Sequence, residues 1–281
     1  MLRAGGKRDS RVLAFGGGSV GDLAGFVASC FLRGVAVAQL PTTLLAQADA
    51  AIGGKTAIDL PEAKNSVGSF HHPDLVVADT RWLATLPREQ LRSGLAEAIK
   101  MAVLFDGALL ARIERDLDAL LAGAPASLAP VVEAAARHKV AVVERDPGER
   151  GERALLNFGH TLGHALEAAA GYRAPAEGGL LHGDAVAFGM LFALRLSRRL
   201  GLAASDAGRV RGLLGRLGLP GLPAASEEEI LAGMARDKKA REGRLDWVLI
   251  EALERGRIDG SLRAEYVASE LRSFLGDPWA D

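Results

Sequence analysis

Short apolar runs alternate with a helical pattern in the first third of the chain. Residues 12–15 and 35–38 are runs of the kind that predicts buried strands, and residues 20–32 between them predict a helix. A strand, a helix and a second strand in this order form a βαβ unit, whose two strands are parallel because the helix carries the chain back to the same end. A further strand is predicted over residues 75–78.

After about residue 87 the pattern changes to amphipathic helices. Apolar residues recur at spacings of three and four from Leu109 to Leu121, which is the period of one helix face. Ser226 followed by Glu229 has the spacing of a capping box, which predicts the start of another helix. The further helices are expected over residues 126–145, 161–170, 184–200, 227–235 and 261–275, with a strand over 247–250.

The two patterns predict two domains of different class. Residues 1–84 are expected to form an α/β domain, a partial Rossmann-like fold with parallel strands. Residues 85–281 are expected to form a mostly α-helical domain. Residues 53–65 show little secondary-structure signal, and we expect a loop there.

The composition excludes several classes of protein. Of the 281 residues, 49% are hydrophobic and 25% are charged, which is typical of a globular domain and not of a disordered chain. Lysine plus arginine total 34 and aspartate plus glutamate 35, so the chain has no basic field to hold nucleic acid or a membrane surface. A single cysteine, Cys30, and no apolar run of roughly 20 residues favour a cytoplasmic protein that does not cross a membrane.

A glycine-rich turn follows the first predicted strand and precedes the first predicted helix. Residues 16–22 read GGGSVGD, and backbone N–H groups at such a helix start can bind a pyrophosphate. An ordinary dinucleotide fingerprint has an acidic residue at the end of the next strand, and here that strand continues into residues 39–43 without one. A tight turn that binds no ligand is therefore the alternative.

Two further groups of residues are suited to binding anions. Glycines beside Lys55, followed by Lys64 and Asn65, can bind a phosphate, although a solvated loop is an equal alternative. Scattered cations in the helical part fit a small polyanionic substrate if they converge, and are otherwise surface charges; they are Lys100, Lys139, Arg153, Lys238 and Lys239.

Three histidines form a candidate metal site. His160 and His164 are four residues apart, on one face of the predicted helix, and His182 follows in the next helical segment. Glu97 is a carboxylate on an otherwise apolar helix. The spacing favours His160 and His164 as a ligand pair but cannot choose two ligands from three, and histidines that pack or cap helices are the alternative.

Taken in order, these segments resemble the 3-dehydroquinate synthase family. The resemblance extends over nearly the whole chain, through residues 16–22, 31–34, 41–43, 53–56, 64–65, 97–100, 157–164, 182–190 and 237–239. It implies a dehydroquinate synthase-like fold and conversion of 3-deoxy-arabino-heptulosonate 7-phosphate to 3-dehydroquinate and phosphate. The implied steps are transient oxidation by NAD⁺, elimination of phosphate, reduction and an intramolecular aldol closure.

The resemblance also implies roles for individual residues. Glu97, His160 and His182 would bind zinc, with cobalt as an alternative, and His164 would face the substrate phosphate. This implied ligand set replaces the pair of His160 and His164 that the spacing favours. The implied NAD contacts are Gly17, Gly18, Asp22, Thr42 and Thr43, with Lys55 and Lys64. The implied substrate-pocket residues are Asp49, Lys55, Lys64, Asn65, Lys100, Lys139, Glu149, Arg153, Asn157, His164 and Lys238 or Lys239. Arg33 would reach the site of a neighbouring subunit, which implies a homodimer.

Family members have further strand–helix units ahead of the glycine turn. We therefore expect that this chain lacks the N-terminal part of the dinucleotide-binding domain, and a catalytically inactive remnant is one alternative. Another sugar-phosphate cyclase, of the 2-epi-5-epi-valiolone synthase type, is a second alternative. A metal-dependent alcohol dehydrogenase of the glycerol dehydrogenase type is a third, although it fits Glu97 and residues 157–164 less well.

Overall fold

The computed structural model describes residues 1–60, 63–173, 175–237 and 245–280. The chain divides into two compact units, each built from two separate stretches of sequence. Unit 1 comprises Met1–Ala98 and Asp118–Arg150, and unit 2 comprises Ile99–Leu117 and Gly151–Asp281. Along the chain, α2 (Arg88–Phe105) and α3 (Gly107–Leu121) pass from one unit to the other. The predicted division after residue 84 lies within unit 1 and stays a prediction.

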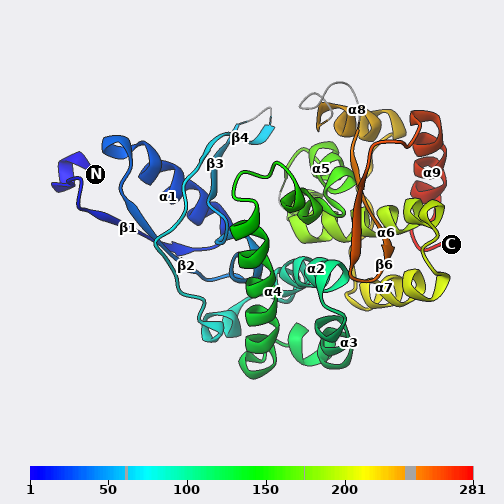
Figure 1. Ribbon diagram of the computed structural model, residues 1–281, viewed down its shortest axis with the longest axis horizontal. Coiled ribbons are helices and arrows are strands. Elements are labelled where there is room, and N and C mark those ends of the chain that lie inside the picture. The colour runs from blue at the N-terminus through cyan, green and yellow to red at the C-terminus, as the bar shows by residue number, and fades with distance from the viewer. Residues whose placement is uncertain (61–62, 174, 238–244, 281) are drawn as a thin grey trace. The chain divides into compact units, whose positions relative to one another are not determined.

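A three-stranded parallel sheet forms the start of unit 1. Its order is β1 (Arg11–Gly16), β2 (Ala36–Pro41) and β5 (Leu75–Val76), with β2 in the centre and Val12 opposite Val37. The helix α1 (Gly18–Cys30) connects β1 to β2 and packs on both strands (Figure 1). This arrangement confirms the βαβ unit predicted from the apolar runs.

An antiparallel hairpin packs on α1 where we expected a loop. Its strands are β3 (Lys55–Leu60) and β4 (Ala63–Phe70). A Cβ atom at Gly25 of α1 would lie 2.4 Å from Cγ2 of Thr56, so a glycine permits this close approach. The expectation of a loop was wrong, because the hairpin is stabilised by pairing and by packing on α1, which a local pattern does not contain.

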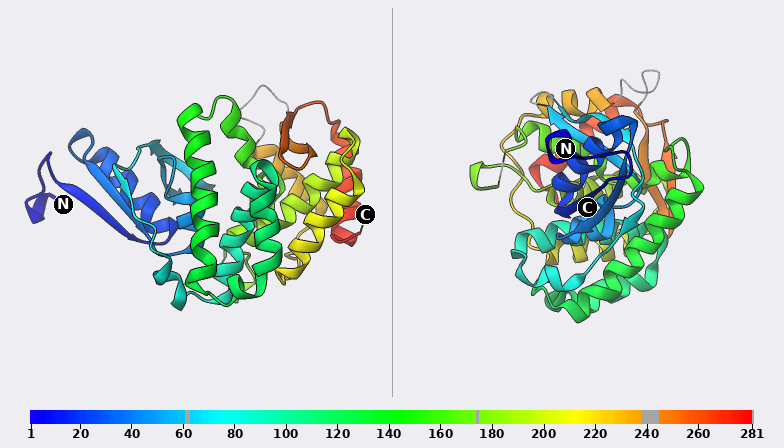
Figure 2. Two further views of the ribbon diagram at one scale, coloured as in Figure 1. Left: turned by 60° about the horizontal axis from the view of Figure 1, so that its bottom comes forward. Right: turned by 90° about the vertical axis from the view of Figure 1, so that its left-hand side faces the viewer.

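The rest of unit 1 is helical. The long helix α4 (Pro125–Arg145), green in Figure 2, confirms the prediction for residues 126–145 and packs against two of the short helices, η3 and η4. The short helices are η1 (Leu2–Ala4), η2 (Phe31–Arg33), the π-helical turn η3 (Ala46–Ala50) and η4 (Thr80–Thr85).

The core of unit 2 is built around α6 (His182–Ser197), which is buried from Gly183 to Ser197. The ring of Phe192 on this helix makes edge contacts with Trp247 and Phe274. The elements that pack on α6 are α5 (His160–Ala169), η7 (Arg198–Leu200), α7 (Ala204–Arg216), β6 (Trp247–Ala252) and α9 (Ala264–Gly276). The unit also contains η5 (Glu152–Asn157), η6 (Pro175–Glu177), α8 (Glu227–Asp237) and β7 (Arg255–Asp259).

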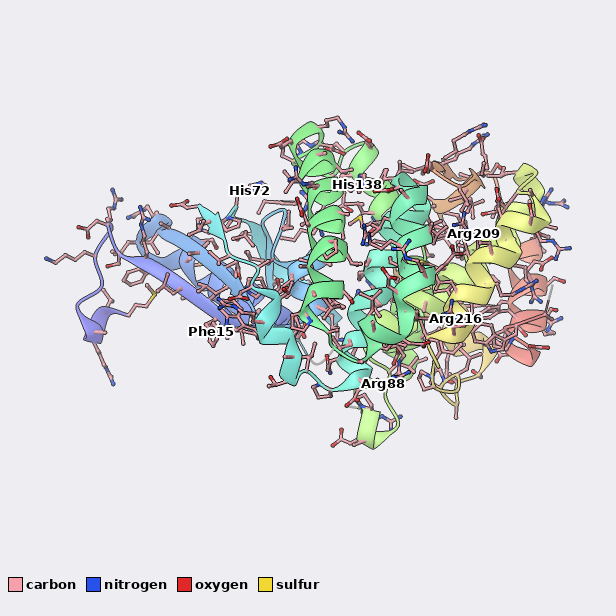
Figure 3. The ribbon with its side chains drawn as sticks, turned by 90° about the horizontal axis from the view of Figure 1, so that it is seen from below. Phe15, His72, Arg88, His138, Arg209 and Arg216 are labelled. Carbon is pink, nitrogen blue, oxygen red and sulfur yellow. The ribbon has the colours of Figure 1, made fainter. Side chains whose placement is uncertain are left out.

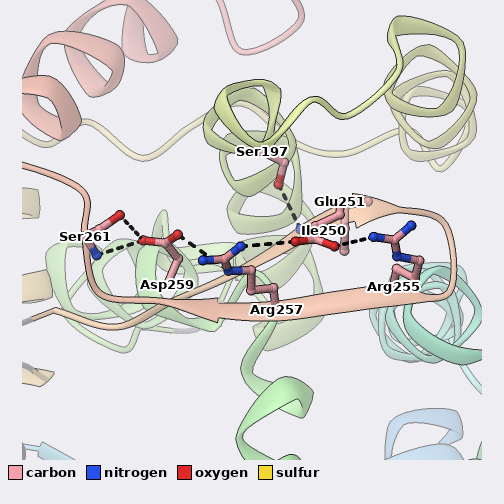
Figure 4. Close-up of polar contacts among 7 residues, drawn as sticks. All are labelled: Ser197, Ile250, Glu251, Arg255, Arg257, Asp259 and Ser261. Atoms are coloured by element: carbon pink, nitrogen blue, oxygen red, sulfur yellow. Dashed lines mark hydrogen bonds and ion pairs between the residues drawn. The ribbon is translucent and has the colours of Figure 1, made fainter.

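Polar contacts join the β6–β7 hairpin to this core (Figure 4). The N–H of Ile250 donates to Oγ of Ser197 at 3.0 Å, and that hydroxyl donates in turn to a carbonyl of its own helix. On the exposed side of the hairpin, Glu251 pairs with Arg255 and Arg257. The predicted strand over residues 247–250 is thereby confirmed, with two more residues at its end.

Other predicted elements of unit 2 are confirmed as well. The N–H of Ser226 donates to Oε2 of Glu229 at 2.8 Å, and the N–H of Glu229 donates to Oγ of Ser226 at 3.1 Å, which is the predicted capping box. The helix α7 was not predicted. It carries Arg209 and Arg216, which Figure 3 labels, and these donate to the side chain and the carbonyl of Glu114. None of the described helices is long and apolar enough to cross a membrane.

Candidate active site

The residues predicted from the sequence separate into two sets, one in each unit. The unit 1 set consists of Gly17, Gly18, Asp22, Arg33, Thr42, Thr43, Asp49, Lys55, Lys64, Asn65, Glu97, Lys139 and Glu149. The unit 2 set consists of Lys100, Arg153, Asn157, His160, His164 and His182. Lys238 and Lys239 lie outside the described residues.

The glycine turn and the end of β2 lie together. The helix α1 begins at Gly18 after the N-cap residue Gly17, and no side chain caps it. The N–H of Thr42 donates to the carbonyl of Gly16 at 2.8 Å, and a Cβ atom at Gly17 would lie 3.0 Å from Cγ2 of Thr43. Backbone N–H groups at such a helix start favour a phosphate, so the predicted NAD contacts in this turn are compatible with the structure.

A cluster of charged residues surrounds Asp22 of α1. Burial is the main cause that raises the pKa of Asp22 to about 6; the negative charges of Asp59 and Asp49 add to the shift, and the positive charge of Lys139 opposes it. Asp49 lies in the π-helical turn η3 and forms an ion pair with Lys139 of α4; the two side chains are 13% and 10% exposed. Three predicted site residues therefore lie close enough to influence one another's charge.

A second ion pair in unit 1 is closer to solvent. Nζ of Lys55, at the start of β3, pairs with the carboxylate of Glu149, and the two side chains are 52% and 18% exposed. Both residues were predicted to contact ligands. In this structure, as in the Asp49–Lys139 pair, a lysine predicted to bind an anion is neutralised by a predicted site carboxylate.

Three unit 1 site residues have backbone conformations that side chains rarely adopt. The φ angles are 70° at Arg33, 55° at Asn65 and 54° at Glu149. Such conformations cost of the order of 1–3 kcal/mol each, except that asparagine tolerates them well, and they concentrate at functional sites. The backbone N–H of Asn65 in β4 also donates to Oδ1 of Asp59 in β3 at 3.1 Å, which joins the two strands near this residue.

The three histidines of unit 2 come together where α5 and α6 begin. The ring centroids of His160 and His164 are 5.3 Å apart, those of His160 and His182 are 5.3 Å apart, and those of His164 and His182 are 6.1 Å apart. Gly159 has a φ of 81°, and a Cβ atom there would lie 2.7 Å from Cγ of Met190. A glycine therefore lets the start of α5 approach α6 closely and brings the three rings into one cluster.

Hydrogen bonds orient two of the three rings. Nδ1 of His160 lies 3.2 Å from the carbonyl oxygen of Phe158, and Nδ1 of His182 lies 3.0 Å from Oε2 of Glu167. A carbonyl oxygen and a carboxylate oxygen only accept, so Nδ1 is the donor in both rings. In the neutral form of each ring the lone pair then lies on Nε2, as a divalent metal requires.

The structure also supplies a buried carboxylate beside the histidines. Ligand atoms of His164, Glu167 and His182 all lie within 4.8 Å of one another, and Glu167 is 2% exposed while His164 is exposed. We did not select Glu167 from the sequence. The signal was present, since Glu167 follows His164 by three residues on an apolar helix, the same pattern that drew attention to Glu97.

Three further predicted residues, Glu97, Lys100 and Arg153, are buried, whereas Asn157 is half-buried and Lys64 is exposed. Glu97 is fully buried on α2 in unit 1, and Lys100, one turn later on the same helix, belongs to unit 2 and is 1% exposed. Arg153 in η5 is also 1% exposed, and Asn157 ends that element. Charged side chains are rarely buried to this degree without a functional or structural task.

Two family models together match residues 1–240 of the chain. The one described as 3-dehydroquinate synthase N-terminal matches residues 1–93, and the one described as 3-dehydroquinate synthase C-terminal matches residues 94–240. A 3-dehydroquinate synthase of Xanthomonas campestris is 50% identical over 261 residues, which are 92% of this chain and 70% of that protein. One of Xylella fastidiosa is 50% identical over 252 residues, covering 89% of this chain and 68% of that protein.

Solved structures of related cyclases have the same fold. A 2-epi-5-epi-valiolone synthase from Streptomyces hygroscopicus, with NAD⁺ and Zn²⁺ bound, matches with a TM-score of 0.89 and 30% identity over 98% of this chain and 76% of that one. A 2-deoxy-scyllo-inosose synthase, in complex with carbaglucose-6-phosphate, NAD⁺ and Co²⁺, matches with a TM-score of 0.86 and 27% identity over 97% and 76% of the two chains. A glycerol dehydrogenase from Schizosaccharomyces pombe shares the fold alone. It is 20% identical, with a TM-score of 0.69 over 99% of this chain and 73% of that one.

Proposed function

Because the chain belongs to the 3-dehydroquinate synthase family, we propose that it converts 3-deoxy-arabino-heptulosonate 7-phosphate to 3-dehydroquinate and phosphate. The observation that carries this proposal is the histidine cluster of α5 and α6, in which the bonds at Nδ1 leave Nε2 of His160 and His182 for a metal. A surface glycine turn or a scattered set of lysines would not by itself support an enzyme of this class.

We propose that Glu97, His160 and His182 hold a zinc ion and that the glycine turn holds NAD⁺. Two histidines and a carboxylate are a common set for catalytic zinc, and cobalt accepts the same donors. Gly17 and Gly18 at the start of α1, with Thr42 and Thr43 beside them, suit the pyrophosphate of a dinucleotide. When bound, NAD⁺ supplies reversible hydride transfer, and zinc supplies polarisation of the substrate's oxygens.

The proposed reaction oxidises the C5 alcohol to a ketone, which acidifies the adjacent C–H bond and permits phosphate to leave. Reduction of the ketone, ring opening and an intramolecular aldol closure complete it. The task of the chain's side chains is to hold a substrate that carries both a phosphate and a carboxylate. We assign the phosphate to Lys55, Asn65 and the exposed His164, and the carboxylate to Lys139 and Arg153, whose guanidinium can bind it in a bidentate manner.

The two ion pairs of unit 1 suit this assignment. Lys55 and Lys139 are each held by a carboxylate, and a substrate anion would replace that carboxylate as the partner. The carboxylate now paired with each lysine holds the ammonium group in place before the substrate binds.

We further propose that the chain acts as a homodimer in the cytoplasm. Arg33 is exposed and lies on a turn with left-handed backbone geometry, as suits a side chain that extends away from its own unit. The single cysteine is compatible with a reducing compartment.

The alternative function is that of a 2-epi-5-epi-valiolone synthase. The specific observation in its favour is the TM-score of 0.89 to such an enzyme. Arg153, assigned to the carboxylate of the substrate, favours the dehydroquinate reaction, because the alternative enzymes act on substrates without that carboxylate.

The test is turnover of 3-deoxy-arabino-heptulosonate 7-phosphate by the purified chain with NAD⁺ and zinc, measured as release of phosphate and formation of 3-dehydroquinate. We expect both products in equal amounts. The variant Glu97→Ala should form neither, whereas Glu229→Ala, which removes a capping carboxylate of α8, should keep the activity. Absence of both products from a chain that still binds zinc would contradict the proposal, and turnover of a sugar phosphate without a carboxylate would support the alternative.

A further inference from the structure

Glu167 is a buried carboxylate to which neither the sequence nor the proposed reaction assigns a task. We propose that Glu167 is a positioning residue that fixes the ring of His182, so that Nε2 of that histidine is the atom presented to the metal. This inference rests on the proposed function, because it takes His182 as a zinc ligand.

The geometry of the contact supports a positioning role. Oε2 of Glu167 lies 3.0 Å from Nδ1 of His182, within the range of a good hydrogen bond, and the side chain of Glu167 is 2% exposed. The bond joins two helices, since Glu167 lies near the end of α5 and His182 is the first residue of α6. A first helical residue has few neighbours of its own helix to restrict its side chain, so an external acceptor is an effective way to fix the ring.

A comparison of the two histidines shows why His182 needs a hydrogen-bond acceptor from another helix. The ring of His160 is oriented by the carbonyl of Phe158, two residues earlier in the same chain segment. His182 is 30% exposed at its side chain and is preceded by Leu181, an N-cap residue that makes no side-chain capping bond. The orientation that a local carbonyl gives to His160 is therefore given to His182 by a side chain from another helix. Histidine ligands usually donate their second nitrogen to such an acceptor, which makes the ligating nitrogen more basic.

A different role for Glu167 predicts different behaviour. With His164 and His182 it forms a set of donors within 4.8 Å of one another, so Glu167 could itself be a metal ligand. As a ligand it would use an oxygen on the metal, and replacement by glutamine would change the ligand set. As a positioning residue it needs only an acceptor, which the amide oxygen of glutamine supplies.

The experiment compares Glu167→Gln and Glu167→Ala with the wild-type chain. Zinc affinity is measured by competition with a chelator, the coordination sphere by the visible absorption of the Co²⁺ form, and the position of the His182 ring proton by NMR of ¹⁵N-histidine in the metal-free protein at a pH where the ring is neutral. The control is Glu229→Ala, because α8 packs on α5 and loss of its capping box weakens that helix without touching His182.

We expect Glu167→Ala to bind zinc about 10- to 100-fold more weakly and to move the ring proton of His182 from Nδ1 to Nε2. Glu167→Gln should keep the proton on Nδ1, the wild-type Co²⁺ spectrum and most of the affinity, and Glu229→Ala should match the wild type in all three measurements. A Glu167→Gln variant with an altered Co²⁺ spectrum would identify Glu167 as a ligand and overturn the inference.

The two proposals fail in different ways. Unchanged zinc affinity and an unchanged ring proton in Glu167→Ala would overturn the positioning role while leaving the metal site in place. Unchanged zinc affinity in His160→Ala and in Glu97→Ala would instead contradict the proposed metal site. A wild-type chain that binds no zinc would overturn both.

Discussion

The two units hold their site residues by different physical means. In unit 1, charged groups of the site neutralise one another, as in the pairs Asp49–Lys139 and Lys55–Glu149, and the pKa of Asp22 is raised by burial and by nearby carboxylates. In unit 2, the rings of His160 and His182 are oriented by hydrogen bonds inside a packed pair of helices. We therefore expect the anion-binding part of this site to respond to pH and, at its exposed ion pair, to salt, whereas the metal-binding part should respond to changes in packing and hydrogen bonding.

The largest electrostatic effect is expected at Asp22. Its pKa is about 6 in the folded chain and 3.8 in a model peptide, so the folded chain binds more protons between these values. The free energy of unfolding should therefore fall as the pH rises from about 4 to 6 and stay level above that. A shift of two pKa units corresponds to about 3 kcal/mol in the free energy of unfolding. Part of the Asp22 side chain remains in solvent, so the measured change should be smaller.

The substitution Asp22→Asn tests this effect. It should raise the free energy of unfolding near pH 7 and leave it nearly unchanged at pH 4, as measured by urea unfolding at several pH values. An equal gain in the free energy of unfolding at both pH values would mean that the surroundings do not destabilise the carboxylate. It would contradict the expectation that the site residues of unit 1 respond to pH.

A smaller effect is expected at the Asp49–Lys139 pair. Because both side chains are mostly buried, each single variant, Asp49→Asn or Lys139→Met, leaves a charge without its partner and should cost more than a conservative change at the surface. A double-mutant cycle by urea unfolding should give a coupling energy of about 0.5–3 kcal/mol. Added salt should change this energy little, since buried charges are poorly screened. A coupling energy of zero would contradict the pairing.

The smallest effect is expected at the Lys55–Glu149 pair. Lys55 is about half exposed, so a cycle of Lys55→Met and Glu149→Gln should give a coupling energy of about 0–1 kcal/mol. Raising the sodium chloride concentration from 0.05 to 0.5 M, roughly a threefold shorter screening length, should reduce it further. A coupling energy larger than that of Asp49–Lys139 would reverse the order that exposure predicts.

Elements with a local signal could be predicted from the sequence. The apolar runs on either side of the glycine turn gave the parallel β1–α1–β2 unit, because burial on a sheet leaves a continuous apolar stretch. The capping box at Ser226 and Glu229 marked the start of α8, since both of its bonds lie within four residues. The β3–β4 hairpin was missed, because its residues alternate weakly and its support comes from α1, thirty residues earlier in the chain.

For the candidate site, the sequence predicted which histidines form a group but not how they are arranged. Residue type and spacing pointed to His160, His164 and His182 as one group, and the structure brings their rings together. Spacing favoured His160 and His164 as the ligand pair, because it measures proximity along one helix and contains no information about the next. The choice of Glu97, His160 and His182 came from the family resemblance and stays a prediction.

The sequence by itself determined which residues are able to do the chemistry: a glycine turn for a phosphate, imidazoles and a carboxylate for a metal, and lysines and arginines for an anionic substrate. How these groups are held depends on contacts between distant parts of the chain. The tertiary structure pairs Lys139 with Asp49, ninety residues away, and Nδ1 of His182 with Glu167 on another helix. The physical reason is that hydrogen bonds and ion pairs depend on distances in space, and helix packing sets those distances through many weak contacts that no local pattern records.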